Sequence, residues 1–274
     1  MSSFKLQDFA TDSPEITVYL TDEANEAQLL SFPAFKEWLA TLKSSLAQQK
    51  FSDHSFYKDR YSLRSIKIQS VDWFGPRIGF VKLKAEIKNS SGEELPGIVF
   101  LRGGSVAVLM ILRPTDARDE RWVIMTEQPR IPAGSLTFME IPAGMIDNTE
   151  RTFKGAAAKE IKEEVGLELR EDELIDMTKL AMQGHKAPET LESAMYPSPG
   201  GCDEYIAIFL WEKEMDRVEI ENLKGKLTGE RTQHENITVR LLDYERLLEV
   251  GSRDAKTLAA WSLYEYLKRT RELP

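Results

Sequence analysis

The sequence predicts an α/β protein in which a mixed sheet lies between helices and a smaller, mostly β domain comes first. Two observations support this prediction. From Gly103 onward, short apolar segments of strand length are separated by helical segments, as in a buried sheet covered on both faces. Earlier in the chain, apolar and charged residues alternate, as in antiparallel strands with one wet face. We therefore expect an N-terminal α+β domain over residues 1–100 and a second domain over residues 101–274.

The N-terminal part contains signals for both strands and a helix. Residues 15–20 indicate a short strand, and Pro33 lies near the start of an amphipathic helix. Large apolar residues follow Pro33 at helical spacing: Phe35, Trp38, Leu39, Leu42 and Leu46. Residues 81–87 alternate between apolar and charged, which predicts a half-buried antiparallel strand. A turn at residues 89–92 leads into another strand that ends at Leu101.

The second part contains longer apolar segments. They predict the strands of a more buried sheet: residues 106–112, 122–126, 205–211 and 237–242. A last helix begins near Asp254, a good N-cap residue, and buries a stripe of apolar residues: Ala260, Leu263, Tyr264 and Leu267. The stretch 182–199 has three Pro and little periodicity, which indicates a long functional loop.

Composition excludes several classes of protein. A net charge of −9 argues against non-specific binding to nucleic acid, and no apolar run is long enough to span a membrane. Residues 1–15 are polar and acidic, unlike a signal sequence or a basic transit peptide. The single cysteine, Cys202, suits a reducing compartment, has no base beside it in the sequence and is interpreted as packing. We expect a cytoplasmic protein. The three histidines have no metal-ligand spacing.

Three carboxylates lie within one turn of a predicted helix. Glu160, Glu163 and Glu164 stand at i, i+3 and i+4, so they share a face and repel one another unless a cation lies among them. Mg²⁺ takes oxygen ligands and keeps positions open for substrate phosphates, and Mn²⁺ is a possible substitute. Gly166 then ends the helix. The alternative is a solvated face with ion pairs to neighbouring lysines.

The segment before this helix adds a second signal. Residues 140–144 form a short apolar strand that closes on a small-residue turn, and Gly144 begins the pattern Gly-x5-Glu-x8-Lys-Glu-Ile-Lys-Glu-Glu-x-Gly-Leu. This pattern resembles the Nudix box, Gly-x5-Glu-x7-Arg-Glu-U-x-Glu-Glu-x-Gly-U with U aliphatic. The gap after Glu150 is one residue longer here, and Lys159 replaces the Arg. Lysine keeps the charge of the arginine but lacks the bidentate fork with which arginine usually braces the helix to the loop that carries Glu150.

The resemblance extends over roughly residues 60 to 270. Residues 127–132 (Glu-Gln-Pro-Arg-Ile-Pro) and 198–204 (Ser-Pro-Gly-Gly-Cys-Asp-Glu) look like segments of ADP-ribose and ADP-sugar diphosphatases. Three further pieces are most similar to the plant-type ADP-sugar diphosphatase branch: residues 73–80, 227–229 and 237–240. The resemblance implies the Nudix α/β/α sandwich and Mg²⁺-dependent hydrolysis of ADP-ribose or an ADP-sugar to AMP and a sugar phosphate.

The resemblance also implies roles for individual residues. Glu160 and Glu164 are the expected metal ligands, with Glu163 as a ligand or water bridge. The backbone carbonyl of Ala143 is expected to join them, and Glu163 and Glu164 are counted as catalytic. Arg130 is the expected diphosphate clamp, since guanidinium meets phosphate oxygens in pairs; the alternative is a surface salt bridge. A general base is expected on the loop before the strand at residue 237, where Glu235 fits first and Glu230 second. Ordinary loop surface is an equal alternative for both.

Two residues outside the metal motif complete the predicted site. Trp73 could stack the adenine from a partner subunit, although an aromatic in an apolar segment is more often core. Glu204 is assigned to the substrate through its loop. The family branch implies a homodimer formed through N-terminal domains, with no nucleic acid or membrane partner. The alternatives are hydrolysis of UDP-sugars or dinucleotides, or a catalytically weak protein that binds a nucleotide.

Overall fold

The computed structural model describes residues 2–6, 15–146, 152–184, 189–229 and 236–273. The chain divides into two compact units. The first holds the described residues of 1–104 together with 189–192 and 198–204, and the second holds the remaining described residues. Among these residues, no helix is both long and apolar enough to cross a membrane.

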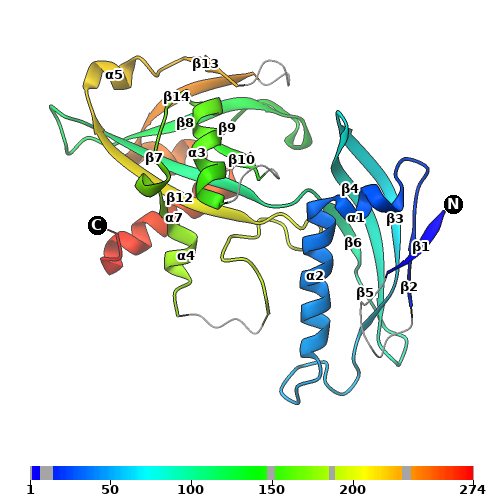
Figure 1. The fold of residues 1–274 in the computed structure, drawn as a ribbon. Helices are drawn as coiled ribbons and strands as arrows, with labels where there is room; N and C mark the ends of the chain where they lie inside the picture. The colour runs from blue at the N-terminus through cyan, green and yellow to red at the C-terminus, as the bar shows by residue number, and fades with distance from the viewer. Residues whose placement is uncertain (1, 7–14, 147–151, 185–188, 230–235, 274) are drawn as a thin grey trace. The chain divides into compact units, whose positions relative to one another are not determined.

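The first unit is a six-stranded sheet with two helices (Figure 1). The sheet order is β1-β2-β3-β4-β5, and β6 pairs with β4. Its elements are β1 (Ser3–Leu6), β2 (Ile16–Tyr19), α1 (Glu26–Ser31), α2 (Pro33–Gln48), β3 (Ser62–Phe74), β4 (Arg77–Lys88), β5 (Glu94–Leu95) and β6 (Ile98–Leu101). Helix α2 buries Ala34 and Phe35 in the core that the sheet provides.

The strands of this unit follow the alternating pattern of the sequence. Val81, Leu83 and Ala85 of β4 are fully buried, whereas the residues between them point to the wetter side. Strands β3 and β4 form a long hairpin that turns at Gly75, whose φ of 58° lies in the left-handed region that favours glycine. The predicted half-buried strand over residues 81–87 is therefore present.

The second unit contains a mixed eight-stranded sheet between helices. The sheet order is β11-β12-β7-β8-β14-β13, with β10 beside β7 and β9 beside β8, and only the β12–β7 pair is parallel among the described strand pairs of this sheet. The strands are β7 (Ser105–Pro114), β8 (Trp122–Arg130), β9 (Ser135–Glu140), β10 (Ala143–Met145), β11 (Ile175–Asp176), β12 (Ile206–Met215), β13 (Leu227–Thr228) and β14 (Ile237–Asp243). The helices are α3 (Phe153–Glu164), α4 (Met177–Ala181), α5 (Arg217–Glu221), α6 (Leu247–Gly251) and α7 (Ala255–Thr270).

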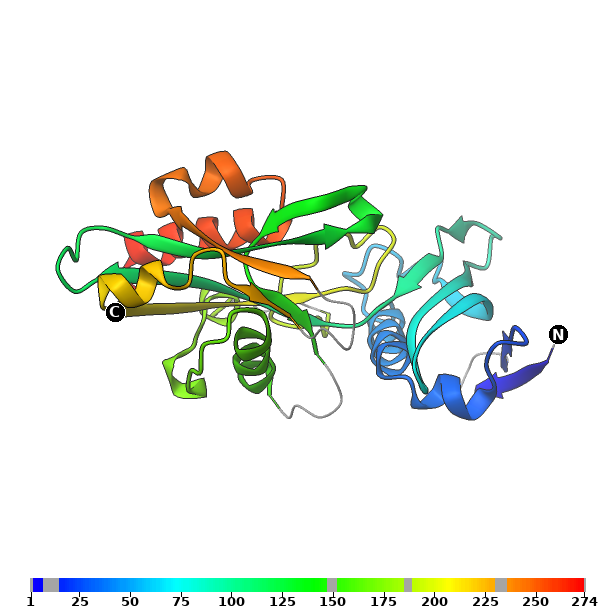
Figure 2. The same ribbon diagram turned by 90° about the horizontal axis from the view of Figure 1, so that it is seen from above.

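Strand β7 shows why this sheet must be covered on both faces. Its even-numbered residues 106–112 belong to the core that α3 covers, and its odd-numbered residues 107–111 belong to the core that α7 covers. Every residue of 105–112 is buried. Figure 2 shows α3 and α7 on opposite faces of the sheet. The α/β fold class with a mixed sheet is confirmed.

Several elements have no counterpart in the sequence-based prediction. Strand β1 is short, and it exists because residues 3–6 pair with residues 16–19 of β2, with Phe4 and Leu6 packed against the core. The sequence analysis predicted one strand over residues 140–144, but β9 ends at Glu140 and β10 begins at Ala143, and these two strands pair with β8 and β7. These pairings join residues that local periodicity does not link. The described residues of 182–199 form no helix or strand apart from an isolated bridge between Met195 and Ile206, as a loop requires, and residues 185–188 lie outside the described residues.

Candidate active site

Helix α3 is the element that carries the candidate metal ligands. The Thr152 side chain caps its start by accepting a hydrogen bond from the Gly155 N–H at 2.9 Å. Gly166, with a φ of 74°, ends it, and its N–H reaches the carbonyl of Ile161 at 3.1 Å. The prediction that Gly166 stops the helix is confirmed. Ala156, Ala157 and Ile161 face the sheet and fix which side of α3 turns inward.

The last turn of α3 is fastened by a short strand far along the chain. The Thr228 hydroxyl donates to the carbonyl of Glu164, and the Gly229 N–H donates to the carbonyl of Glu163 at 3.2 Å. Carbonyls at a helix C-terminus have no partner within the helix, so these two bonds satisfy groups that would otherwise need water. The segment 227–229, which the sequence analysis linked to the diphosphatase branch, thus acts as a brace for the carboxylate helix.

Glu164 is a buried carboxylate held from two sides. Glu164 is 5% exposed. Its Oε2 accepts a hydrogen bond from the Ala143 N–H at 3.0 Å, and its Oε1 accepts one from Nε2 of Gln128 at 3.2 Å. Burial, together with the nearby charges of Glu160 and Glu140, raises the pKa of Glu164 to about 8 despite these two donors. The buried Glu164 carboxylate therefore lacks compensating positive charge, and a bound cation would supply it.

Glu160 lies against the turn that precedes α3. A Cβ placed on Gly144 would overlap the Glu160 carboxylate, so the glycine provides the space in which this side chain lies. Glu160 and Glu164 therefore both face the Ala143–Gly144 segment, as the i, i+4 spacing predicts. The group that comes close to Gly144 in the structure is thus the Glu160 carboxylate.

The remaining residues of the motif lie elsewhere. Glu163 is on the exposed side of α3, where Lys162 pairs with Glu168 at 2.8 Å. Glu163 is therefore exposed, while Glu164 turns inward, and the alternative of a solvated face stays open for Glu163. Glu150, the first carboxylate of the motif, lies outside the described residues. The effect of the longer gap before Lys159 stays untested.

The donors fit a Mg²⁺ site that substrate would complete. Within the described residues, no group of three or more His, Cys, Asp or Glu side chains is arranged to hold a metal. Two crowded carboxylates and the neighbouring backbone of Ala143 nevertheless match Mg²⁺, which is held by one or two carboxylates plus waters and substrate phosphates. Glu160, Glu164 and the carbonyl of Ala143 are the groups that would hold it.

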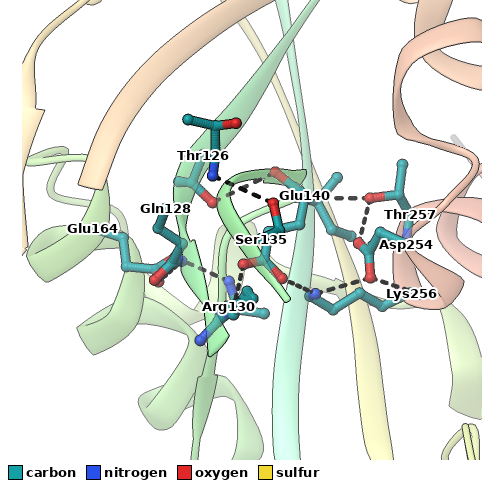
Figure 3. Close-up of polar contacts among 12 residues, drawn as sticks. Thr126, Gln128, Arg130, Ser135, Glu140, Glu164, Asp254, Lys256 and Thr257 are labelled. Atoms are coloured by element: carbon teal, nitrogen blue, oxygen red, sulfur yellow. Dashed lines mark hydrogen bonds and ion pairs between the residues drawn. The ribbon is translucent and has the colours of Figure 1, made fainter. Parts of the chain in front are cut away.

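Arg130 lies beside this carboxylate face, at the end of strand β8. Its Nε donates to Oε1 of Glu140 at 2.7 Å, and the two side chains are 41% and 2% exposed (Figure 3). Burial alone would lower the pKa of Arg130, but the charges of Glu140, Glu164 and Asp254 outweigh it and hold that pKa above its ordinary value. Arg130 thus forms a salt bridge, as in the alternative, but its partner carboxylate is buried, and its role as diphosphate clamp stays a prediction.

A polar network that the sequence analysis did not find connects Glu140 to the start of α7. Lys256 Nζ contacts Oε2 of Glu140 and lies 2.9 Å from Oδ1 of Asp254. Asp254 caps α7, as predicted, and its Oδ2 accepts the Thr257 hydroxyl at 2.6 Å. That hydroxyl accepts the N–H of Ile141 at 3.1 Å. The network ties the segment before Ala143 to a helix more than a hundred residues later, and no local sequence signal marks it.

The other predicted substrate residues belong to the first unit or lie outside the described residues. Trp73 is partly buried and packs against the core of the first unit, while the adjacent Phe74 is 42% exposed. Glu204 forms an ion pair with Arg102 at 3.4 Å. The candidate bases Glu235 and Glu230 both lie outside the described residues. Their roles stay predictions.

The loop that carries Glu204 is anchored to strand β6. Asp203 accepts the N–H groups of Arg102 and Gly103, at 2.7 Å and 3.1 Å, and burial raises the pKa of Asp203 despite these bonds. Cys202 is half-buried and burial raises the pKa of its thiol, which agrees with a packing role. Backbone pairing with Phe100 of β6 also holds this segment within the first unit.

Comparison with known proteins agrees with this geometry. A model of the NUDIX domain matches residues 102–262. The chain is 39% identical over 236 residues to Nudix hydrolase 14, chloroplastic, of Arabidopsis thaliana, covering 86% of this chain and 71% of that protein.

Two solved structures are also similar. One, described as an ADP compounds hydrolase, has a TM-score of 0.48 and 13% identity and covers 78% of this chain and 97% of that one. A MutT/nudix family protein from Enterococcus faecalis has a TM-score of 0.28 and 14% identity over 40% and 36% of the two chains. From the domain match and the Arabidopsis relative, with the carboxylate helix in its expected place, the chain belongs to the Nudix hydrolase family.

Proposed function

We propose that the protein hydrolyses the diphosphate link of ADP-ribose or an ADP-sugar to AMP and a sugar phosphate, with Mg²⁺ as cofactor and Mn²⁺ as a substitute. One observation carries the proposal: strand β8 ends at the partly exposed Arg130, and two residues earlier on the same strand Gln128 donates to the buried carboxylate of Glu164 at 3.2 Å, whose charge raises the pKa of Arg130. The arginine that would bind phosphate oxygens therefore lies next to the carboxylates that would bind a divalent ion. Figure 3 shows Gln128 between the two residues.

Different residues of the chain would bind the metal, bind the phosphates and accept the proton. A bound Mg²⁺ would neutralise phosphate charge and lower the pKa of a coordinated water. Glu160, Glu164 and the Ala143 carbonyl would hold the ion, with Glu163 as ligand or water bridge. Arg130 would bind phosphate oxygens through its terminal NH groups, since Nε is already used by Glu140. Glu235, or else Glu230, would take the proton from the attacking water.

The choice of substrate rests on sequence segments. Residues 127–132 supply Gln128 and Arg130 to the site, and residues 198–204 resemble the corresponding loop of ADP-sugar diphosphatases. UDP-sugars and dinucleotides are the alternative substrates. A nucleotide-binding protein without turnover is a third possibility, which the presence of Glu160, Glu163 and Glu164 disfavours.

A turnover panel tests the proposal. Purified protein with Mg²⁺ would be given ADP-ribose, ADP-glucose, UDP-glucose, a dinucleotide and a nucleoside triphosphate, and the products identified. We expect AMP and a sugar phosphate from the first two. Release of pyrophosphate from the triphosphate as the fastest reaction would overturn the assignment. Absence of turnover from every substrate, with nucleotide binding retained, would favour the binding protein.

We propose a homodimer for the assembled enzyme and retain the cytoplasmic location as a prediction from the sequence. The first unit exposes an aromatic surface in which Phe74 and Phe100 each contact Phe80, with ring centroids 4.9 Å and 5.1 Å apart. Phe74, Phe100 and Ile98 are 42%, 37% and 49% exposed. Contiguous apolar side chains of this kind favour a protein interface. The name of the Arabidopsis relative assigns that protein, and not this one, to the chloroplast.

A further inference from the structure

The buried carboxylate of Glu140 is shared by two cations. Oε1 accepts Nε of Arg130 at 2.7 Å, and Oε2 contacts Nζ of Lys256 (Figure 3). The Glu140 side chain is 2% exposed and that of Lys256 is 12% exposed, so water can replace neither contact easily. Each oxygen of the carboxylate thus has a cation of its own.

This sharing limits how Arg130 can bind Glu140. A guanidinium facing a carboxylate normally forms two parallel hydrogen bonds, which would use Nε and one terminal NH group of Arg130. Lys256 stands at the second oxygen and leaves Arg130 a single bond through Nε. Asp254 holds Lys256 there, because its Oδ1 lies 2.9 Å from Nζ. Within the described residues, Glu140 is the only hydrogen-bond partner of the Arg130 side chain.

The charges around Arg130 reinforce this role of Lys256. Glu140, Glu164 and Asp254 all act on the guanidinium of Arg130. Lys256 is paired to two of these three carboxylates. Without its ammonium, Glu140 would have an uncompensated oxygen in a buried place, and the nearest donors to satisfy it would be those of Arg130.

We propose that Lys256 is a positioning residue for the phosphate-binding arginine: by occupying Oε2 of Glu140, it keeps the terminal NH groups of Arg130 available to the diphosphate of the substrate. This proposal rests on the function proposed above for Arg130. Lys256 itself touches neither substrate nor reacting atoms in this scheme, and its effect passes through Arg130 alone.

The primary test is the Lys256→Met variant, assayed on the best substrate of the turnover panel. We expect KM to rise about tenfold, the value of one charge-assisted hydrogen bond, with kcat changed much less. Lys256→Arg should restore most of the loss because it still gives donors to Oε2. Lys268→Met removes a lysine from an exposed position of the same helix, where it contacts Tyr264, and should leave KM unchanged.

A double-mutant cycle separates positioning from general effects. In an Arg130→Gln background, Lys256→Met should raise KM no further, because there is no guanidinium left to misplace. A purely electrostatic or structural effect of Lys256 would persist in that background. Equal effects of Lys256→Met with and without Arg130 would therefore overturn the proposal, as would an effect on kcat alone.

A second variant keeps the test valid if Lys256→Met folds poorly. Glu140→Gln/Lys256→Met removes both the charge and the bidentate acceptor at position 140. Asp254 loses its ammonium partner but keeps its cap bonds to the Thr257 N–H and hydroxyl, so we expect folding and a KM close to that of Glu140→Gln alone. A KM raised to the level expected for Lys256→Met would contradict the proposal. If the wild-type protein turns over no nucleoside diphosphate sugar, the proposed function itself has failed; if it does and the cycle shows no coupling, only the role of Lys256 has failed.

Discussion

Gly144 and Glu160 are matched in shape: the Glu160 carboxylate fills the space where a side chain at position 144 would begin. The φ of Gly144 is not in the left-handed region, so the requirement for glycine comes from close approach and not from backbone strain. The two residues are sixteen positions apart, one more than in the Nudix box, and they nevertheless meet in the structure. The turn and the helix must meet at this point for both carboxylates to face it.

Gly144→Ala should therefore damage the site more than the fold. The added Cβ would push the Glu160 carboxylate away from the turn and misplace one expected metal ligand. We expect turnover to fall about a hundredfold, in line with the cost of misplacing a catalytic group by an ångström. The Mg²⁺ concentration needed for half-maximal activity should rise. Turnover and Mg²⁺ dependence close to wild type would show that Glu160 is not a ligand.

Glu164→Gln should abolish catalysis while preserving the fold. Glutamine keeps the size and helix propensity of the side chain but removes the charge that would offset Mg²⁺. Turnover should fall severely, because positioning and charge neutralisation by the metal supply most of the rate. If this face were merely solvated, stability would change by no more than about 0.5 kcal/mol and turnover would be intact. Turnover and thermal midpoint measured on one preparation distinguish the two outcomes, and a folded variant within a few-fold of wild type would contradict the metal site.

The pKa of Glu164 predicts how the stability of the metal-free protein varies with pH. Burial raises this pKa from 4.5 to about 8, so between these values the folded protein holds a proton that the unfolded chain has released. Stability must then fall as pH rises through this window, by about 1.4 kcal/mol for each pKa unit of the shift as an upper estimate. The contribution is fully present below pH 4.5 and lost above pH 8.

The measurement is the thermal midpoint of metal-free protein from pH 5 to 8. Glu164→Gln serves as the reference, because Asp203 and other shifted groups titrate in both proteins. We expect the wild-type protein to lose stability with pH relative to the variant, and added Mg²⁺ to reverse the trend by favouring the carboxylate. Parallel curves for the two proteins without metal would show that Glu164 does not hold its proton in the folded state.

Thr228→Val should loosen the end of the carboxylate helix. The variant keeps the shape of the side chain but removes the hydroxyl that donates to the Glu164 carbonyl. We expect a loss of about 1 kcal/mol in the free energy of unfolding, the usual net value of such a bond, together with reduced turnover. Thr228→Ser keeps the hydroxyl and should retain both properties. Chemical denaturation of the three proteins measures the difference. Equal stability of the Val and Ser variants would show that the Thr228 hydroxyl does not stabilise the end of α3.

Light scattering tests the proposed dimer. We expect twice the 31.3 kDa chain mass at working concentration, and Phe74→Ser, which places a polar group on the exposed aromatic surface, should favour the monomer. Trp73→Ala should lower stability, because Trp73 packs against the core of the first unit. An unchanged KM in a dimeric Trp73→Ala protein would exclude Trp73 from adenine stacking. A monomer of the wild-type protein would reject the dimer itself.

The sequence by itself determined the elements whose partners are near in the chain. The i, i+4 spacing of Glu160 and Glu164, with Gly166 after them, predicts a helix with a carboxylate face, and helical geometry leaves little freedom in how such residues are arranged. Alternation and apolar runs predict strands because a strand has a fixed two-residue period. The motif spacing from Gly144 to α3 is similarly local, and it was enough to identify the family.

Only the tertiary structure decided which residues surround those carboxylates. Gln128 reaches Glu164 across 36 positions of sequence, Thr228 reaches it across 64, and Lys256 reaches Glu140 across 116. Such contacts depend on the register of paired strands and on where α7 begins, and neither has a local pattern in the sequence. The burial that raises the pKa of Glu164 has the same origin, since a carboxylate is desolvated only when distant segments pack around it.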